Sequence, residues 1–140
     1  MKKVTPFLWY ENNADEAMKF YVSIFKNAKI TSPGTFQIDG QEFMVFNGGP
    51  EFKFNEAVSL FVNCDTQQEV DELWEKLSDG GQKNRCGWLK DKYGLSWQII
   101  PSSLVNMLND KDPVKSKRVM DAMLKMTKIN IEALKKAYNQ

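Results

Sequence analysis

Two copies of one local pattern, 53 residues apart, constrain the fold of this chain most. Asn13 followed by Glu16 has the form of a capping box, and Thr66 followed by Glu69 repeats it, so that two helix starts are predicted. After each box, apolar residues recur at intervals of three and four, which is typical of a helix that packs one stripe against a sheet. The stripes are Ala17, Phe20, Tyr21, Ile24 and Phe25 in the first copy, and Val70, Leu73, Trp74 and Leu77 in the second.

Strand-like runs flank both predicted helices. Residues 4–10 and 57–63 precede them, and two hairpins follow: 29–38 with 41–47 across Asp39-Gly40, and 84–90 with 95–100 across Tyr93-Gly94. Matched units of this size commonly stack symmetrically to share buried surface. We therefore expect an α+β fold in which paired βαβββ modules form a cupped mixed sheet.

A helical tail follows the second module. Val119, Ala122, Met123 and Met126 form one apolar stripe, and Asn130 is placed to cap a last helix that carries Ile131, Leu134 and Tyr138. The sequence leaves open whether these helices pack on their own subunit or on a partner. At 140 residues the chain is predicted to be a single domain, with modules at 1–50 and 51–101 and the tail at 102–140.

Composition indicates a cytoplasmic protein that does not enter a membrane. No apolar stretch reaches the roughly 18 residues of a membrane span, and the Met-Lys-Lys start lacks the apolar core of a signal peptide. Cys64 and Cys86 lie in unrelated contexts and the chain has no histidine, so we interpret both as reduced structural thiols rather than zinc ligands.

Charge patterning argues against nucleic-acid binding. The net charge is +1, yet residues 111–140 hold eight basic and three acidic residues. Acidic residues interrupt these lysines and Tyr138 is the one aromatic among them, whereas a nucleic-acid site favours a concentrated basic stripe with interleaved aromatics. We interpret the basic tail as a solvated helix face.

Three segments carry a family resemblance: TPFLWYENNADEAMKFY, DGQEFMVFNGGPEFKFNEAVSLFVNC and GWLKDKYGLSWQIIP. They closely resemble the PhnB-like, or 3-demethylubiquinone-9 3-methyltransferase-like, branch of the glyoxalase/bleomycin resistance (vicinal oxygen chelate) superfamily. The likeness covers nearly the whole chain, including the Asp112-Pro113 start of the tail, while the stretch 30–36 is shorter than the loop and strand of relatives. Methyl transfer is not indicated, because no Gly-rich loop follows a strand as in nucleotide- or S-adenosylmethionine-binding βαβ units.

The resemblance implies where a metal would bind in this superfamily. Those positions fall at Pro6, Met44, Ser59 and Gln98. Proline has no side-chain donor, methionine favours soft metals, and neutral Ser and Gln oxygens bind a divalent ion weakly. We therefore predict neither a metal nor another cofactor.

Strand alternation predicts which side chains line the cup. Residues two apart share a face, which selects Pro6, Leu8, Tyr10, Glu42, Met44, Phe46, Ser59, Phe61, Asn63, Ser96, Gln98 and Ile100. The opposite faces, with Phe7, Trp9, Phe43, Val45, Leu60, Val62, Trp97 and Ile99, are more apolar and are expected to meet the helices. A mainly apolar cup with a few polar groups is the usual composition of a small-molecule pocket.

The sequence is compatible with three functional hypotheses. The first is a metal-free homodimer that binds a small, partly apolar organic molecule. The second is a superfamily enzyme (lyase, isomerase or dioxygenase) that uses a metal or a general base, for which Glu42 near Tyr10 is the candidate catalytic residue. The third is a structural dimer module whose cup is packed solid.

Overall fold

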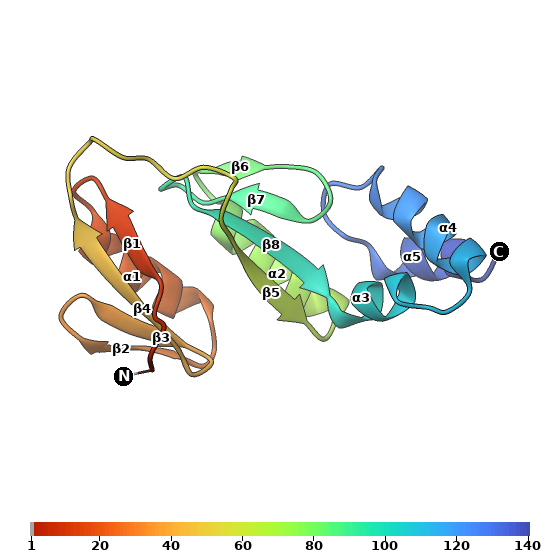
Figure 1. Ribbon diagram of the computed structural model, residues 1–140, viewed down its shortest axis with the longest axis horizontal. Helices are drawn as coiled ribbons and strands as arrows, with labels where there is room; N and C mark the ends of the chain where they lie inside the picture. The colour runs from red at the N-terminus through yellow and green to blue at the C-terminus, as the bar shows by residue number, and fades with distance from the viewer. Residues whose placement is uncertain (1) are drawn as a thin grey trace. The chain divides into compact units, whose positions relative to one another are not determined.

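The computed structural model describes residues 2–140 and contains two four-stranded sheets, each accompanied by one helix, followed by three tail helices (Figure 1). The chain divides into two compact units, one that ends at Asn55 and one that spans Glu56–Gln140. Both units begin with the order strand, helix, strand, strand, strand. The predicted α+β fold with two βαβββ modules and a helical tail is confirmed.

The first unit consists of β1 (Phe7–Tyr10), α1 (Ala14–Ile24), β2 (Ala28–Ser32), β3 (Thr35–Ile38) and β4 (Gln41–Asn47). Its strand order is β1-β4-β3-β2, with β1 parallel to β4 and the other neighbours antiparallel. The strand predicted at 29–38 is in fact a hairpin, because Pro33 and Gly34 form a two-residue turn in which Gly34 has a φ of 77°. The module therefore has all four strands, although the stretch 30–36 is short.

The second unit consists of β5 (Ser59–Cys64), α2 (Gln67–Ser78), β6 (Gln82–Lys83), β7 (Trp88–Lys90), β8 (Ser96–Pro101), α3 (Ser102–Leu108), α4 (Pro113–Met123) and α5 (Ile131–Tyr138). Its strand order, β5-β8-β7-β6, repeats that of the first sheet, again with a parallel pair at β5 and β8. The repeat inferred from sequence is therefore a repeat of topology.

The two helix starts differ in how their free amides are satisfied. At α2, the Thr66 hydroxyl accepts a hydrogen bond from the Glu69 amide (3.2 Å), and the Glu69 carboxylate accepts one from the Asp65 amide (2.8 Å). At α1, the Asn13 side chain makes no capping hydrogen bond, so the Asn13 half of the predicted box does not form. The Ala14 amide instead donates to Asn47 Oδ1 (2.8 Å), which joins the helix start to the end of β4.

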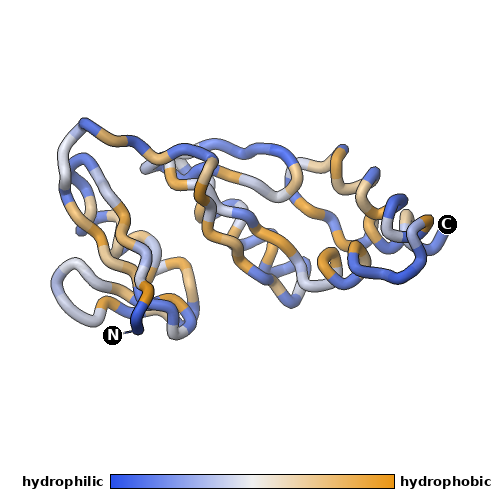
Figure 2. Tube along the Cα trace, in the orientation of Figure 1, coloured by the Kyte–Doolittle hydropathy of each residue, from blue (hydrophilic) through white to orange (hydrophobic). Residues whose placement is uncertain are grey.

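The tail packs on its own unit. Its core comprises Ile100 from β8 together with Leu104, Val119, Ile129 and Leu134, each at most 5% exposed. Orange and blue alternate along the tail helices in Figure 2, as expected of helices with one buried face. Backbone hydrogen bonds from Cys86 to Met126 (2.9 Å) and from Gly87 to Thr127 (2.8 Å) extend this attachment. Among residues 2–140, no helix has the length and apolar character needed to cross a bilayer.

Candidate functional site: the open faces of the two sheets

Each sheet has one face against a helix and one face that carries exposed side chains. In the first sheet, the Tyr10 hydroxyl lies 2.9 Å from the Tyr21 hydroxyl of α1, and the Tyr21 ring packs on Phe36 with centroids 5.7 Å apart. The opposite face carries Phe7, Trp9, Glu42, Met44 and Phe46, and we call it the open face of the first sheet.

The predicted phase of β1 is wrong by one residue. In the parallel register Phe7 pairs with Met44 and Trp9 pairs with Phe46, so these four side chains share a face. Leu8 and Tyr10, predicted to line the cup, are buried on the helix side instead. Because side chains alternate along a strand, a shift of one residue moves every side chain to the other face. Pro6, the third residue of that predicted set, lies before β1 begins.

The open face of the first sheet carries a cluster of aromatic side chains. The Trp9 ring contacts Phe46 (centroids 5.2 Å apart) and Phe52 (5.0 Å), and Phe46 contacts Phe7 (5.7 Å). Phe7 is 56% exposed and Phe46 43% exposed. The indole of Trp9 is fixed by a hydrogen bond to the Gly49 carbonyl (3.0 Å) and by Gly48, where a Cβ atom would lie 2.1 Å from the ring.

Glu42 lies on β4 opposite Gln37, next to the hairpin turn, and is half-buried. It shares the open face with Met44 and Phe46, whereas Tyr10 points to the other side of the sheet. The predicted proximity of Glu42 to Tyr10 is therefore wrong. The geometry does not favour the general-base hypothesis, since the Tyr10 hydroxyl is already within hydrogen-bond distance of Tyr21.

In the second sheet the predicted faces agree with the register. Ser59 pairs with Ser96 and Phe61 pairs with Gln98, while Leu60, Val62, Trp97 and Ile99 occupy the other face, toward α2. The antiparallel neighbour β7 adds Lys90 beside Ser96 and Trp88 beside Gln98. We call the set Ser59, Phe61, Trp88, Lys90, Ser96 and Gln98 the open face of the second sheet.

Trp88 and Lys90 also reach this face, although strand alternation in the sequence did not select them. The signal was present in the hairpin turn, because the register across Tyr93-Gly94 aligns each β7 residue with one β8 residue. The turn itself is held by Asp91, a buried carboxylate that accepts hydrogen bonds from the Tyr93 amide (2.9 Å) and the Leu95 amide (3.0 Å). This fixed turn determines which β7 side chains reach the open face.

Two residues predicted to line the cup, Ile100 and Asn63, do not lie among the other side chains of the open face. Ile100 lies on the predicted face of β8, but it is 5% exposed because the tail helices pack against it. Asn63 is exposed at the end of β5. The tail therefore covers the end of this face at which β8 finishes, whereas Phe61, which pairs with Gln98 in the middle of β8, is 53% exposed.

The donor set at the implied metal positions does not fit a divalent cation. Gln98 Nε2 donates to Ser59 Oγ (2.9 Å), so these two neutral groups are bound to each other. The register also shows that the first-module counterpart of Ser59 is Thr5 rather than Pro6, because Met44 pairs with Phe7 as Gln98 pairs with Phe61. Hydroxyl, thioether and amide groups together make a weak divalent-ion site. Within residues 2–140, no three His, Cys, Asp or Glu side chains are grouped so as to hold a metal ion.

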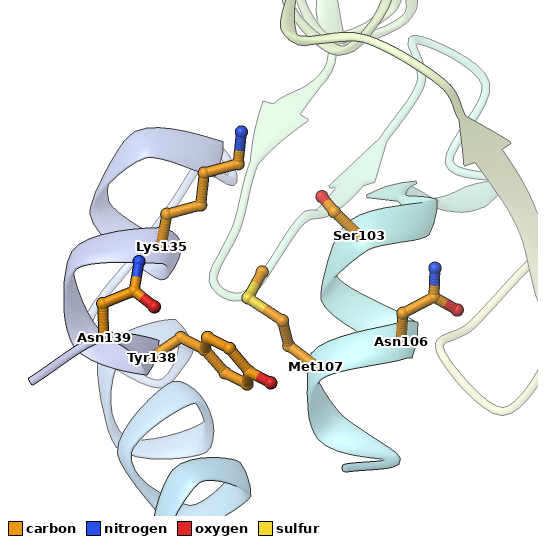
Figure 3. Close-up of a pocket in the computed structure, with 6 residues that line it drawn as sticks. All are labelled: Ser103, Asn106, Met107, Lys135, Tyr138 and Asn139. Atoms are coloured by element: carbon orange, nitrogen blue, oxygen red, sulfur yellow. The ribbon is translucent and has the colours of Figure 1, made fainter.

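A hollow of about 400 Å³ lies in the tail between α3 and α5, lined by Ser103, Asn106, Met107, Lys135, Tyr138 and Asn139 (Figure 3). Met107 and Tyr138 pack against the tail core, and the Tyr138 hydroxyl donates to Asp110 (2.5 Å). The hollow thus lies between two helices, α3 and α5, whose side chains mainly pack against the tail core.

Comparison with known proteins identifies the family. The chain belongs to the 3-demethylubiquinone-9 3-methyltransferase family, the PhnB-like branch of the glyoxalase/bleomycin resistance superfamily, and the family model matches residues 2–35 and 32–100. The matched residues span both βαβββ modules and stop before α3. The expected likeness at Asp112-Pro113 lies outside the matched residues.

Solved structures agree with this assignment. A PhnB protein from Bacillus cereus, described provisionally as a 3-demethylubiquinone-9 3-methyltransferase, is 36% identical, and the match covers 72% of this chain and 100% of that one with a TM-score of 0.66. A protein from Pseudomonas aeruginosa is 17% identical over 72% of this chain and 98% of its own, with a TM-score of 0.60, which shows the fold alone. The comparison with curated proteins finds no match.

Proposed function

We propose that this protein binds a small, partly apolar organic molecule on the open faces of its sheets. The observation that carries the proposal is the exposure of aromatic side chains on faces that lie opposite α1 and α2: Phe7 and Phe46 on the first sheet, and Phe61, 53% exposed, on the second. Exposed apolar patches on a folded protein commonly mark interaction sites.

Polar groups placed beside the aromatic rings also support binding. On the second sheet Phe61 and Trp88 flank Gln98, whose amide is oriented by its hydrogen bond to Ser59. Small-molecule sites commonly combine apolar walls with a few fixed polar groups. The proposal concerns binding, because the described residues offer neither a nucleophile with an activating base nor a fitting metal-ligand set.

The methyl transfer named in the family description is not part of the proposal. In each sheet the strand after the helix lies at the opposite edge from the strand before it, as the orders β1-β4-β3-β2 and β5-β8-β7-β6 require. A βαβ unit that binds S-adenosylmethionine or a nucleotide would place two such strands parallel and close together, with a Gly-rich loop between strand and helix.

The test is a titration of the purified protein with two matched probes, 2-naphthoate and 2-naphthamide, followed by calorimetry and by the melting temperature. We expect saturable binding of at least one probe, with a rise in melting temperature at concentrations above its Kd. Phe61→Ala and Phe46→Ala should weaken binding about fivefold at whichever sheet is used. Val114→Ala, which removes an exposed apolar side chain from the tail, is the control. Failure of both probes to saturate at millimolar concentration would refute the proposal.

Homodimerisation is a second part of the proposal. It is supported by the family resemblance; the apolar tail stripe gives less support than the sequence suggested, because Val119 and Leu134 are buried within one unit. Light scattering at micromolar concentration tests it directly. We expect twice the 16.2 kDa mass of one chain, and a monomer would exclude the dimer.

A cytoplasmic location completes the proposal. It is supported by Cys64 and Cys86, both free thiols, since proteins of oxidising compartments usually pair their cysteines. Cell fractionation with compartment markers tests it, and recovery of the protein outside the cytoplasmic fraction would reject it.

A further inference from the structure

Three polar side chains form a row across the open face of the second sheet. Ser59 of β5 pairs with Ser96 of β8, and Ser96 pairs with Lys90 of β7. Directly paired residues on antiparallel strands have Cβ atoms about 5 Å apart, so Lys90 and Ser96 are side-chain neighbours, and Ser59 is the partner of Ser96 on its other side. The next row along the strands, Phe61, Gln98 and Trp88, is largely aromatic.

Ser96 is the unusual member of the polar row. It is 1% exposed, and its Oγ atom has no hydrogen-bond partner among the described residues. A buried polar group without a partner is uncommon in folded proteins because its desolvation is uncompensated. A hydroxyl group beside a lysine is well suited to donate to an anionic oxygen, which would satisfy it.

Lys90 already binds a carboxylate that the chain itself supplies. Its Nζ atom lies 2.7 Å from Glu56 Oε1, with the lysine side chain 29% exposed and the glutamate side chain 62% exposed. The hydrogen bond from Lys90, followed by its positive charge, lowers the pKa of Glu56, so the contact joins two charged groups. Glu56 precedes β5 and belongs to no strand, so that it can move aside without disturbing the ladder.

Ser59 can contribute a second hydroxyl donor. Its oxygen accepts from Gln98 Nε2, which leaves its own hydrogen available for another acceptor. The row therefore offers one ammonium and two hydroxyl donors, adjacent to the rings of Phe61 and Trp88. That combination matches a planar apolar molecule that carries a carboxylate group.

We propose that Lys90 and Ser96 bind the carboxylate group of the ligand, and that Glu56 occupies the same place when no ligand is present. This inference rests on the proposed function and specifies its ligand class as an organic carboxylate. It also assigns Glu56 a role as an internal competitor, because ligand and glutamate cannot both hold the Lys90 ammonium in the same geometry.

The experiment measures the affinity of 2-naphthoate relative to its neutral analogue 2-naphthamide. In the unmodified protein we expect the carboxylate to bind about tenfold more tightly, as for a charge-assisted hydrogen bond. Lys90→Gln should abolish the preference, and Lys90→Arg should retain it. Ser96→Ala should weaken naphthoate binding and leave naphthamide binding unchanged. Glu56→Gln should strengthen naphthoate binding several-fold, with no effect on naphthamide.

A matched ion pair elsewhere in the same unit provides the control. Lys83 on β6 binds both carboxylate oxygens of Glu75 on α2 at 3.0 Å, so Lys83→Gln and Glu75→Gln remove the same charges away from the polar row. These variants should leave the preference unchanged. If both probes bind equally and Lys90→Gln has no effect, the inference is wrong while the proposed function stands. If neither probe binds, both fail.

Discussion

The buried carboxylate of Asp91 accepts a 3.0 Å hydrogen bond from the indole nitrogen of Trp97, its neighbour across the β7 to β8 turn. Asp91 also accepts from the amides of Tyr93 and Leu95, so that one side chain satisfies three N–H groups of the hairpin. This hairpin turn fixes the register that places Lys90 beside Ser96 and Trp88 beside Gln98. The positions of the side chains on the open face therefore depend on Asp91.

Replacement of Asp91 should destabilise the second unit. Asp91→Ala leaves buried N–H donors without an acceptor, and we expect the free energy of unfolding to fall by about 3 kcal/mol. Urea denaturation followed by tryptophan fluorescence measures the change. Asp39→Asn, in the exposed turn of the other module, is the control and should alter stability by less than about 0.5 kcal/mol. A loss below 1 kcal/mol for Asp91→Ala would show that the turn does not need the carboxylate.

The local periodicity of apolar residues was sufficient to predict most of the helices and strands. The α2 stripe of Val70, Leu73, Trp74 and Leu77 is buried as predicted, because helix amphipathicity is encoded within a few turns. The faces of β5 and β8 were also predicted, since both strands alternate clearly. Helix caps were less predictable: Asn13 begins α1, but the nearby Asn47 supplies the hydrogen bond to the Ala14 amide.

The site was predicted less well, because faces depend on register between distant strands. The helices of the two modules are 53 residues apart, whereas the strand pairs Phe7 with Met44 and Phe61 with Gln98 imply an offset of 54. When the helix offset of 53 is used to align β1 with β5, the alignment is wrong by one residue, and the two faces of β1 are interchanged in the prediction. The burial of Ile100 by the tail is a tertiary contact that no local pattern in β8 could reveal.

The hydroxyl pair of Tyr10 and Tyr21 should show energetic coupling. Both rings are buried and the oxygen atoms are 2.9 Å apart, so removal of either hydroxyl leaves the other without this partner. We expect Tyr10→Phe and Tyr21→Phe each to cost about 1.5 kcal/mol, and the double variant to cost less than the sum of the two. A double-mutant cycle in urea measures the coupling. Strict additivity would show that the two hydroxyl groups do not interact in solution.

The two thiols should differ in reactivity. Burial, followed by the nearby carboxylates of Glu69 and Asp65, raises the pKa of Cys64 to about 12, so that thiolate is scarce at neutral pH. Cys86 is only half-buried. We expect iodoacetamide at pH 8 to alkylate Cys86 well before Cys64, as followed by peptide mass spectrometry, and both to react equally in urea. Equal rates in the folded protein would contradict the buried position of Cys64.

The contact between Tyr138 and Asp110 should make the tail sensitive to pH at both extremes. The hydrogen bond from Tyr138, followed by that from the Asp112 amide, lowers the pKa of Asp110, and the same contact with Asp110 raises the pKa of Tyr138. A lowered carboxyl pKa stabilises the fold above the unfolded value of about 3.9, and this contribution is lost as the pH falls through the folded value. A raised phenol pKa stabilises below about 10, and this contribution is lost as the pH rises through the folded value.

Hydrogen exchange of the α5 amides tests this pH dependence. Protection in the unmodified protein should exceed that in Tyr138→Phe between about pH 4 and pH 10, and the difference should shrink outside that window on both sides. Asp121→Asn removes a carboxylate whose ion pair with Lys117 lies within α4, and it serves as the control that leaves the difference unchanged. Because the Tyr138 hydroxyl joins α5 to the segment before α4, a difference independent of pH would show that the ring of Tyr138, rather than its hydroxyl group, holds these helices together.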